Sequence, residues 1–410
     1  MMQYIRENKN LEGKTVLLRA DLDAPHEGAN ILNDYRIRMA LATIEFLYGQ
    51  GAKVIILSKT GRPKTSADWA SRDLSESLKP AAELLAQLLH KKPLATASKI
   101  PVYDAGQLVF FTGDIRLKEN QEIIKNAAQK DIILLDNMRF YPEEEGCDRE
   151  FGKVLASLGD LYVNDAFAVS HRAETSVTVL PTLLPAYAGL NLENEIKSLD
   201  KVLKIATRPF VLIMAGIKIS DKIGILRNLG KSADAILIGG GLANLFFKVK
   251  GYEIGKSRVE TEKADLAEEL LRNYKESLIL PVDVVVAKPD FSGVRVCAPI
   301  EVKSDEVIFD IGPETILEYS RYIKTAQKMV WNGPMGFFEQ KQFSNGTKSI
   351  ALIFASKCDE NCFGVVGGGD TLEAIEAAKV GQHISFISTG GGAMLEYLAG
   401  ETLPGIAALN

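Results

Sequence analysis

The sequence has few cysteines and no long hydrophobic run, and each absence excludes a class of protein. Four cysteines in 410 residues cannot build the disulfide framework of a small secreted domain. Cys358 and Cys362 are close enough in sequence that a zinc site is conceivable. No histidine or second cysteine pair lies near them, however, and two reduced thiols are the simpler interpretation. No stretch approaches the roughly 20 apolar residues that span a bilayer.

An export signal and an excess of basic residues are also missing. The first residues contain no apolar segment of the kind that directs secretion, so we expect a cytoplasmic protein. Lys and Arg together number 48 against 53 Asp and Glu, which gives a net charge of −5. Nucleic-acid and membrane binders usually carry a basic face. We therefore expect small molecules as partners, no nucleic acid, no membrane, and a monomer.

The length and the hydrophobic pattern predict two α/β domains. A domain typically has about 100–200 residues, so 410 residues favour two. Short runs that are apolar on both faces alternate with amphipathic helical patterns, and this order predicts parallel sheets with helices on both faces. The predicted strands are 15–18, 53–57, 132–135, 211–214, 235–238, 282–286, 364–366 and 384–388. The predicted helices include 36–48, 78–89, 265–274 and 372–379.

A polar helical segment near the middle of the chain is a candidate connection between the domains. Residues 190–206 carry alternating acidic and basic side chains, and Pro209 discourages continuation of the helix beyond them. The alternative is an ordinary surface helix within one domain.

Three glycine clusters in the second half indicate a nucleotide site. At 239–241, 367–369 and 390–392, a predicted strand meets three glycines and then a helix. Glycine lets a ligand approach the backbone closely, and a helix N-terminus presents free N–H groups that suit phosphate. A single cluster would more often be a tight turn, but three in one topological position favour a nucleotide cleft.

The common nucleotide motifs are absent. None of the clusters fits G-x-G-x-x-G, which argues against a dinucleotide-binding dehydrogenase. Residues 251–257 resemble a Walker A loop but have one spacer residue too few and follow a helix instead of a strand. We interpret this segment as a turn.

Charged residues in the first half collect where predicted strands end. Each alone would be an ordinary surface charge, but the carboxyl ends of parallel strands form one edge, where ligands bind. Arginine in particular makes forked hydrogen bonds to phosphate and carboxylate. This pattern predicts a site for a small, doubly anionic molecule. The residues are Arg19, Asp21, Asp23, Arg36, Lys59, Arg62, Arg139, His171 and Arg172, with the histidine in a supporting role.

Several strings in the chain resemble the signature blocks of the phosphoglycerate kinase family, in order and over nearly the whole length. They are GAKVIILSKTGRP (51–63), LLDNMRFYPEE (134–144), VNDAFAVSHR (163–172), KISDKI (218–223), LIGGGLA (237–243), WNGPMGFFE (331–339), VVGGGDT (365–371) and STGGGAMLE (388–396).

The resemblance implies two Rossmann-like domains, each a three-layer αβα sandwich around a parallel sheet, in a bilobal molecule with a hinge. It places an acid-binding domain at 1–188, a linking hinge helix at 189–207 and a nucleotide-binding domain at 208–392. The segment 393–410 would return toward the first domain. The implied activity is phosphotransfer with a carboxyl acceptor: 1,3-bisphosphoglycerate plus ADP gives 3-phosphoglycerate plus ATP, reversibly, with Mg²⁺, in glycolysis and gluconeogenesis.

The resemblance also implies roles for individual residues. Lys218 and Arg36 would flank the transferred phosphoryl group, helped by the backbone at Gly369 and Gly392. Asp370 would position Mg²⁺. The substrate-binding set would be Asp21, Asp23, Arg36, Lys59, Arg62, Arg139 and Arg172. The nucleotide-binding set would be Gly216, Lys218, Lys222, Gly241, Asn332, Pro334, Glu339, Gly368, Gly369, Asp370 and Thr371, with Glu339 on the ribose.

The chain departs from the family pattern at several positions. The family usually has Asn at the position of Asp23, and His at those of Lys59 and Glu174. We hypothesise that Lys59 pairs with Asp23 and so offsets its charge beside an acidic substrate. Ile217 is bulkier than the Ala of the family, which leaves the nucleotide preference open. The alternatives are a kinase of another small acid on the same scaffold, a two-lobed solute-binding protein and, more distantly, a dehydrogenase.

Overall fold

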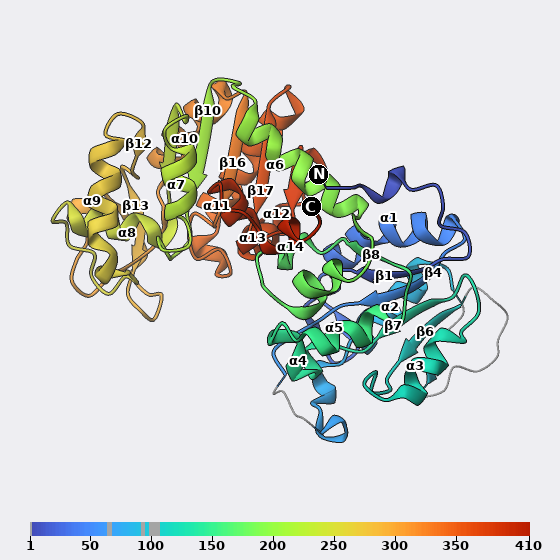
Figure 1. Ribbon diagram of the computed structural model, residues 1–410. Helices are drawn as coiled ribbons and strands as arrows, with labels where there is room; N and C mark the ends of the chain where they lie inside the picture. The colour runs from blue at the N-terminus through green and yellow to red at the C-terminus, as the bar shows by residue number, and fades with distance from the viewer. Residues whose placement is uncertain (1, 64–67, 92–94, 98–106) are drawn as a thin grey trace. The chain divides into compact units, whose positions relative to one another are not determined.

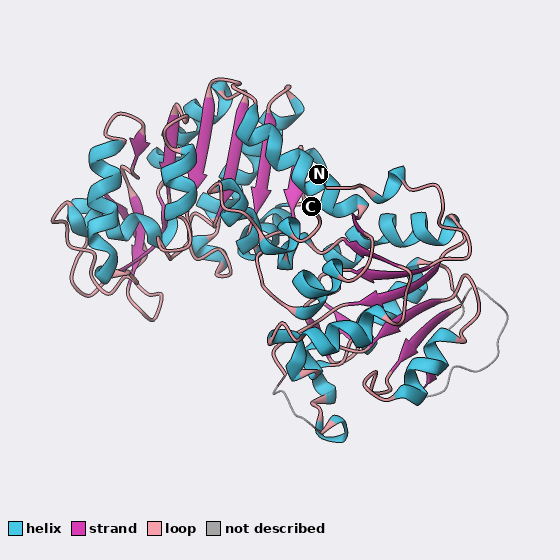
Figure 2. Ribbon diagram, in the orientation of Figure 1, coloured by secondary structure: helices cyan, strands magenta, loops and turns pink. Residues whose placement is uncertain are grey.

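The chain is divided into two units, each built around a parallel sheet. The computed structural model describes residues 2–63, 68–91, 95–97 and 107–410, with only the backbone of 95–97. The first unit comprises Met1–Ile196 and Thr402–Asn410, and the second comprises Lys197–Glu401. Figures 1 and 2 show the strands and the helices that cover them. No helix among the described residues is both long and apolar enough to cross a membrane.

The first unit contains a seven-stranded parallel sheet in the order β5-β6-β7-β4-β1-β8-β9. Its central strands are short, rich in branched residues and buried on both faces: β4 has the sequence KVIIL and is buried at every position. A small hairpin is formed by β2 (His26–Glu27) and β3 (Asn30–Ile31). The sheet strands are β1 (Thr15–Arg19), β4 (Lys53–Leu57), β5 (Ala95–Ala97), β6 (Leu108–Phe111), β7 (Ile132–Leu135), β8 (Leu161–Asn164) and β9 (Ala186–Ala188).

Helices cover both faces of this sheet, as the sequence predicts. On one face, Val54 and Ile56 belong to a core that includes Ile44 of α1 and Leu85 of α2. Ile55, which points to the other face, is equally buried. The helices of this unit are α1 (Tyr35–Gly49), α2 (Lys79–Leu88), α3 (Lys118–Lys125), α4 (Pro142–Glu145), α5 (Arg149–Ala156) and α14 (Pro404–Ala407).

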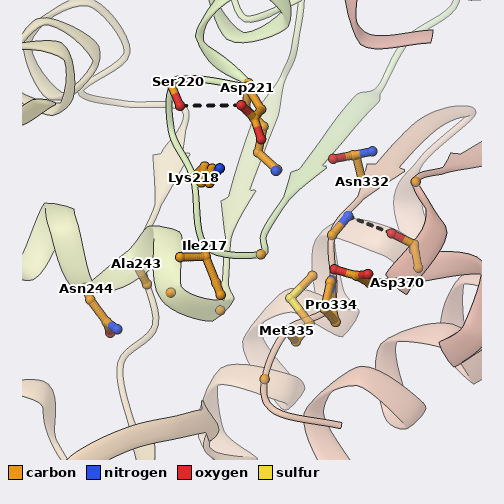
Figure 3. Close-up of a pocket in the computed structure, with 18 of the residues that line it drawn as sticks. Ile217, Lys218, Ser220, Asp221, Ala243, Asn244, Asn332, Pro334, Met335 and Asp370 are labelled. Carbon is orange, nitrogen blue, oxygen red and sulfur yellow. Dashed lines mark hydrogen bonds between the residues drawn. The ribbon is translucent and has the colours of Figure 1, made fainter. Parts of the chain in front are cut away.

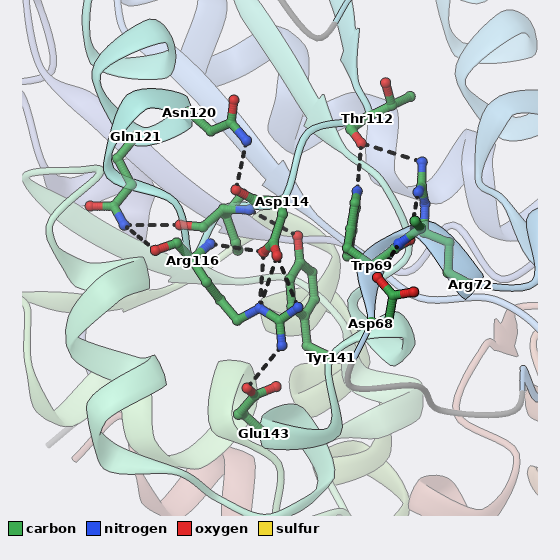
Figure 4. Close-up of polar contacts among 12 residues, drawn as sticks. Asp68, Trp69, Arg72, Thr112, Asp114, Arg116, Asn120, Gln121, Tyr141 and Glu143 are labelled. Carbon is green, nitrogen blue, oxygen red and sulfur yellow. Dashed lines mark hydrogen bonds and ion pairs between the residues drawn. The ribbon is translucent and has the colours of Figure 1, made fainter.

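An aromatic and polar network fixes the segment between β4 and α2. The Trp69 indole N–H donates to the carbonyl of Thr112 at 3.1 Å, and its ring stacks on Tyr141 with centroids 4.7 Å apart. Beside it, Arg116 contacts Glu143 at 3.2 Å (Figure 4). The network anchors the chain that leads away from the loop after β4, where several predicted site residues lie.

The second unit contains a six-stranded parallel sheet in the order β12-β11-β10-β16-β17-β18. The core on one face joins residues of the sheet to Tyr319 of α10, Phe354 of α11 and Ile375 of α12. Residues that alternate with these along the strands, such as Leu212, are also fully buried, so the opposite face is covered too. The strands are β10 (Phe210–Met214), β11 (Ala235–Ile238), β12 (Leu278–Ile279), β16 (Lys328–Asn332), β17 (Phe363–Gly367) and β18 (Phe386–Ser388).

The glycine clusters open helices, as expected. Each of α8, α12 and α13 begins within the cluster that follows β11, β17 or β18, and residues 251–257 form a loop after α8. The helices are α7 (Ile223–Leu229), α8 (Gly240–Val249), α9 (Ala264–Asn273), α10 (Pro313–Thr325), α11 (Asn345–Asp359), α12 (Gly369–Ala378) and α13 (Gly392–Leu398).

The prediction of a parallel strand at 282–286 is wrong. The chain here forms β13 (Val284–Ala287), which pairs antiparallel with β14 (Arg295–Cys297) and β15 (Val307–Ile311) in a separate three-stranded sheet. The connection from β13 to β14 spans only residues 288–294, whereas a parallel crossover needs a dozen or more. The three consecutive valines at 284–286 give no alternation from which to recognise a sheet with one exposed face.

Both ends of helix α6 (Leu190–Lys204) are held by hydrogen bonds between side chains and the backbone. At its start, Asp165 Oδ1 accepts hydrogen bonds from the backbone N–H of Asn191 at 2.8 Å and of Leu192 at 3.2 Å. At its end, Lys328 Nζ donates to two backbone carbonyls, at 2.9 Å to Val202 and 2.8 Å beyond the helix. The Asp165 carboxyl group caps the first turn of the helix, and the ammonium of Lys328 complements the helix dipole at its end.

The division into units falls inside α6, between Ile196 and Lys197. Residues 393–401, which the sequence analysis grouped with the returning segment, lie in the second unit, and Thr402–Asn410 lies in the first. The domain boundaries 1–188, 189–207, 208–392 and 393–410, and their binding roles, stay predictions.

Candidate functional site

The carboxyl ends of five neighbouring strands in the second unit surround one cavity of about 1010 Å³. The loops after β11, β10, β16, β17 and β18 all contribute to its lining. β10 and β16 are neighbours in the sheet, and the strands that follow in sequence are added in opposite directions on their two sides. Open α/β sheets bind ligands at the point where the strand order reverses in this way. The cavity is lined by every predicted nucleotide-binding residue, namely Gly216, Lys218, Lys222, Gly241, Asn332, Pro334, Glu339, Gly368, Gly369, Asp370 and Thr371, and by Gly392.

One wall of the cavity is built from interlocked backbone. The N–H of Gly216 donates to the carbonyl of Pro334 at 3.1 Å, and the N–H of Leu242 donates to the carbonyl of Gly216 at 2.6 Å. Gly240 has a φ of 59°, and a Cβ there would lie 2.7 Å from the carbonyl oxygen of Pro334. A side chain at this position would therefore separate the loops after β11 and β16.

The opposite end of the cavity presents the N-terminus of α12. Gly368 adopts a φ of 104° before the helix, and the side-chain amide of Asn332 donates to the carbonyl of Gly367 at 2.7 Å. Thr371 Oγ1 accepts the N–H of Gly333 at 2.8 Å, so the loops after β16 and β17 are tied together. The free N–H groups of the first helical turn are suited to an anion.

Charged side chains of both signs lie at this end (Figure 3). Lys218 and Asp370 are exposed, whereas Lys222 is buried. Burial lowers the pKa of Lys222, and the carboxylates of Asp221 and Asp370 offset part of this effect. Burial also raises the pKa of Glu373, and Asp370 raises it further.

An apolar wall, which the sequence analysis did not assign, completes the cavity. Ile308, Phe309 and Phe337 line it, and the Phe309 ring stacks on Phe343 behind it with centroids 4.4 Å apart. Ile217 borders the same space and is 47% exposed. The sequence signal for Ile308 and Phe309 is the apolar run 307–309, which resembles any buried strand, and Phe337 lies in the block 331–339.

In the first unit, the predicted acid-binding residues follow strands of the parallel sheet. Asp21 and Asp23 follow β1, Lys59 and Arg62 follow β4, Arg139 and Arg172 come after β7 and β8, and Arg36 lies in the first turn of α1. The structure brings Arg36 near both aspartates: its Nε lies 3.6 Å from Asp21 Oδ2, and its Nη1 lies 3.8 Å from Asp23 Oδ2.

The hypothesis that Lys59 pairs with Asp23 is wrong. Lys59 is 2% exposed, and its Nζ lies against both carboxylate oxygens of Glu174, which is 4% exposed. Asp23 instead accepts hydrogen bonds from the Thr60 hydroxyl at 3.0 Å and the Gly61 N–H at 3.4 Å. Glu174 follows a different strand, and its distance from Lys59 in sequence hid the pairing.

The charge of Arg19 acts on both members of the Lys59–Glu174 pair. Burial and, to a smaller extent, Arg19 lower the pKa of Lys59, Glu174 partly offsets both effects, and the net pKa is about 8. Burial opposes ionisation of Glu174, but Lys59 and Arg19 together hold its pKa below the usual value. The carboxylate therefore stays charged, and the ammonium is the group that titrates.

The other cationic residues predicted to bind the acid do not gather in one cavity. Arg139 donates to the carbonyl of Gly61, and Arg62 and Arg172 are exposed. A cavity of about 990 Å³ lies in this unit, and Asp23 is the single member of the predicted set among its described lining residues. The structure thus places the cationic side chains along one sheet edge without enclosing them in that cavity.

Comparisons with known proteins agree with the geometry. The family model for phosphoglycerate kinase matches residues 6–401. Phosphoglycerate kinases of Dictyoglomus turgidum and Pelotomaculum thermopropionicum are 43% and 40% identical to the chain, and each alignment covers 98% of the chain and 97% of the relative. The chain belongs to the phosphoglycerate kinase family.

Solved phosphoglycerate kinase structures share the fold. That from Coxiella burnetii has a TM-score of 0.82 at 36% identity and covers 100% of the chain and 99% of its own. That from Pyrococcus horikoshii has a TM-score of 0.83 at 31% identity and covers 100% and 98%. The phosphoglycerate kinase match spans both units, so neither a solute-binding protein nor a dehydrogenase is favoured.

Proposed function

We propose that the chain catalyses reversible phosphoryl transfer from 1,3-bisphosphoglycerate to ADP, giving 3-phosphoglycerate and ATP. The observation that carries the proposal is the cavity of the second unit, which gathers all the predicted nucleotide residues from five strand ends in a member of the phosphoglycerate kinase family. We further propose that the enzyme works as a cytoplasmic monomer in glycolysis and gluconeogenesis.

The nucleotide would lie across the cavity with its base against the apolar wall. Glu339 would accept the ribose hydroxyls, because a carboxylate is an acceptor for both. The phosphates would face Lys222, Asn332 and the N-terminus of α12, where N–H groups and positive charge complement them.

The residues at α12 suit the way in which Mg²⁺ binds. Asp370 is exposed in the first turn of the helix and borders the cavity. Mg²⁺ typically takes one or two carboxylates plus substrate phosphate oxygens, so the carboxylate of Asp370 beside the phosphate end fits. When bound, the ion would neutralise part of the charge on the phosphates.

The acid would bind in the first unit along the sheet edge. Arg62, Arg139 and Arg172 offer forked donors for a phosphate and a carboxylate. Lys59 would act from beneath this surface, through its charge, because its ammonium is buried against Glu174.

The reaction requires no general base. Both nucleophiles, a carboxylate in one direction and a phosphate oxygen in the other, are already anionic. The barrier then comes from aligning the anions and from charge on the transferred group. We propose that Lys218 and Arg36 stabilise that charge, with the backbone N–H groups of Gly369 and Gly392. Each such donor typically contributes about 3 kcal/mol.

A steady-state assay with 3-phosphoglycerate, ATP and Mg²⁺ tests the proposal, with other small acids in parallel. We expect Lys218→Ala and Arg36→Ala each to lower kcat by about 100-fold or more while substrate affinity changes little. Arg38→Ala, two residues from Arg36 on the exposed side of α1, is the matched control and should be fully active. Near-normal turnover in both test variants would refute the assigned roles.

A further inference from the structure

Glu260 directs its carboxylate away from its own helix. It occupies the residue before the short 3-10 helix at Thr261–Lys263, where a side chain would ordinarily cap that helix, and it makes no such bond. Instead, its Oε2 accepts the backbone N–H of Ile219 at 2.6 Å and of Ser220 at 3.3 Å. Its Oε1 accepts the Ser220 hydroxyl at 3.0 Å.

These contacts lie on the loop that carries the two lysines of the cavity. Lys218 immediately precedes the bonded segment, and Lys222 follows it. In Figure 3, Lys218, Ser220 and Asp221 occupy this one stretch of chain at the edge of the cavity. Successive N–H groups that converge on one anion form a compact binding concavity, and bonds to a charged acceptor are roughly twice as strong as neutral ones.

The alternatives for holding this loop are weaker. The Ser220 hydroxyl also approaches Asp221 Oδ1, but at 3.4 Å, farther than Glu260. The side chain of Ile219 is fully buried and anchors one point of the loop, yet it does not orient the neighbouring peptide groups. The carbonyl of Ile219 accepts the N–H groups of Lys222 and Ile223, each at 2.9 Å, which holds the following part of the loop. Among the side chains, Glu260 is the one that binds the N–H groups of the backbone directly after Lys218.

We propose that Glu260 is a positioning residue for phosphoryl transfer: by binding the amides of Ile219 and Ser220, it fixes the backbone from which Lys218 and Lys222 reach the phosphates. This inference rests on the proposed function. Glu260 touches no reacting atom in this role. Its effect is therefore on the alignment of the lysines, and it should appear in turnover more than in affinity for the acid.

Three variants test the inference. Glu260→Gln keeps the size of the side chain and a carbonyl oxygen that can accept the amides, but it removes the negative charge that strengthens those bonds and replaces the oxygen that accepts the Ser220 hydroxyl with a donor. We expect kcat to fall about 10-fold to 100-fold, as for the loss of charged hydrogen bonds, with the KM for 3-phosphoglycerate within about twofold of wild type. Glu260→Asp retains the charge and should recover part of the lost kcat. Glu262→Gln, an exposed residue nearby, is the matched control and should be unaffected.

Hydrogen exchange provides a readout that does not depend on activity. The amides of Ile219 and Ser220 should exchange faster in Glu260→Gln than in wild type or Glu262→Gln. Unchanged exchange at these amides, or a wild-type kcat in a folded Glu260→Gln protein, would overturn the inference. A lower unfolding midpoint with unchanged kcat and KM would also overturn it, because that is the signature of a merely structural residue. An inactive wild-type enzyme would instead reject the proposed function, and the exchange measurement would still report on Glu260.

Discussion

The ammonium of Lys59 lies against both carboxylate oxygens of Glu174, and both side chains are almost completely buried. The two residues come from loops that follow different strands of the first sheet. A buried pair of this kind gains little over two neutral side chains, but either charge left alone in the interior is costly. The two positions are therefore coupled, and their coupling can be measured.

We predict strongly non-additive stability effects at this pair. Lys59→Met or Glu174→Gln alone should lower the free energy of unfolding by about 3 kcal/mol, because each leaves one buried charge unpaired. The double variant should lose clearly less than the sum. Urea unfolding of the four proteins measures the coupling. The exposed pair Lys153 and Glu150 is the control, with an expected coupling of about 0.5 kcal/mol or less.

Binding of 3-phosphoglycerate should weaken at alkaline pH because Lys59 loses its charge. Its pKa is lowered to about 8, so above that pH it loses its proton and leaves the negative charge of Glu174 uncompensated. We expect the KM for 3-phosphoglycerate to rise between about pH 7.5 and 9 by more than in Lys59→Arg, which stays charged throughout. Glu174→Gln removes the carboxylate that stabilises the charged ammonium of Lys59. The rise in the KM for 3-phosphoglycerate should therefore begin at a lower pH in this variant. A wild-type profile that matches Lys59→Arg would contradict this assignment.

Asp165 should make stability depend on pH in the acidic range. Burial raises its pKa to about 7, well above the value of about 3.9 in an unfolded chain. Its contribution is therefore fully present below about pH 4 and is lost as pH rises through 7, since the folded state then carries a buried charge. Asp165→Asn does not titrate and should flatten this part of the profile. Urea unfolding at several values between pH 4 and 8 compares the two proteins, and identical slopes would exclude the effect.

Ile217 should contribute to nucleotide affinity and not to acid affinity. Its side chain borders the cavity beside Gly241, against which a base would pack. Ile217→Ala removes three carbons from that surface, and a change of this size in an apolar pocket is worth about 1–3 kcal/mol. We expect the KM for ADP to rise about 10-fold while the KM for 3-phosphoglycerate stays constant. Leu352→Ala, at an exposed position outside the cavity, should change neither.

Much of the fold follows from local patterns in the sequence. Runs such as 54–57 are apolar at every position because both faces of the sheet are covered, and they predict the strands correctly. Glycine clusters mark the strand ends because only there must the backbone turn sharply beside a ligand. The run at 282–286 fails because the three valines at 284–286 carry no alternation, so the sequence does not show which face of the strand is buried.

The sequence predicted which residues lie at the strand ends, but not how their side chains pair. Charge at strand ends indicates which edge of each sheet is used, since parallel strands end together. The partner of Lys59 depends on how two distant loops fold over each other. Asp23 was the wrong choice because the hypothesis rested on two departures from the family pattern whose charges would offset each other. Glu260 gave no signal either: an acidic residue before a helix indicates a cap, and its contact with the backbone of a remote loop is a property of the tertiary structure.

Residues 402–410 pack into the first unit, where the N–H of Gly405 donates to the carbonyl of Ser170 at 2.8 Å. On the ribosome, these residues emerge only after the whole of the second unit has been translated. The first unit therefore cannot complete its packing until the second unit has been translated.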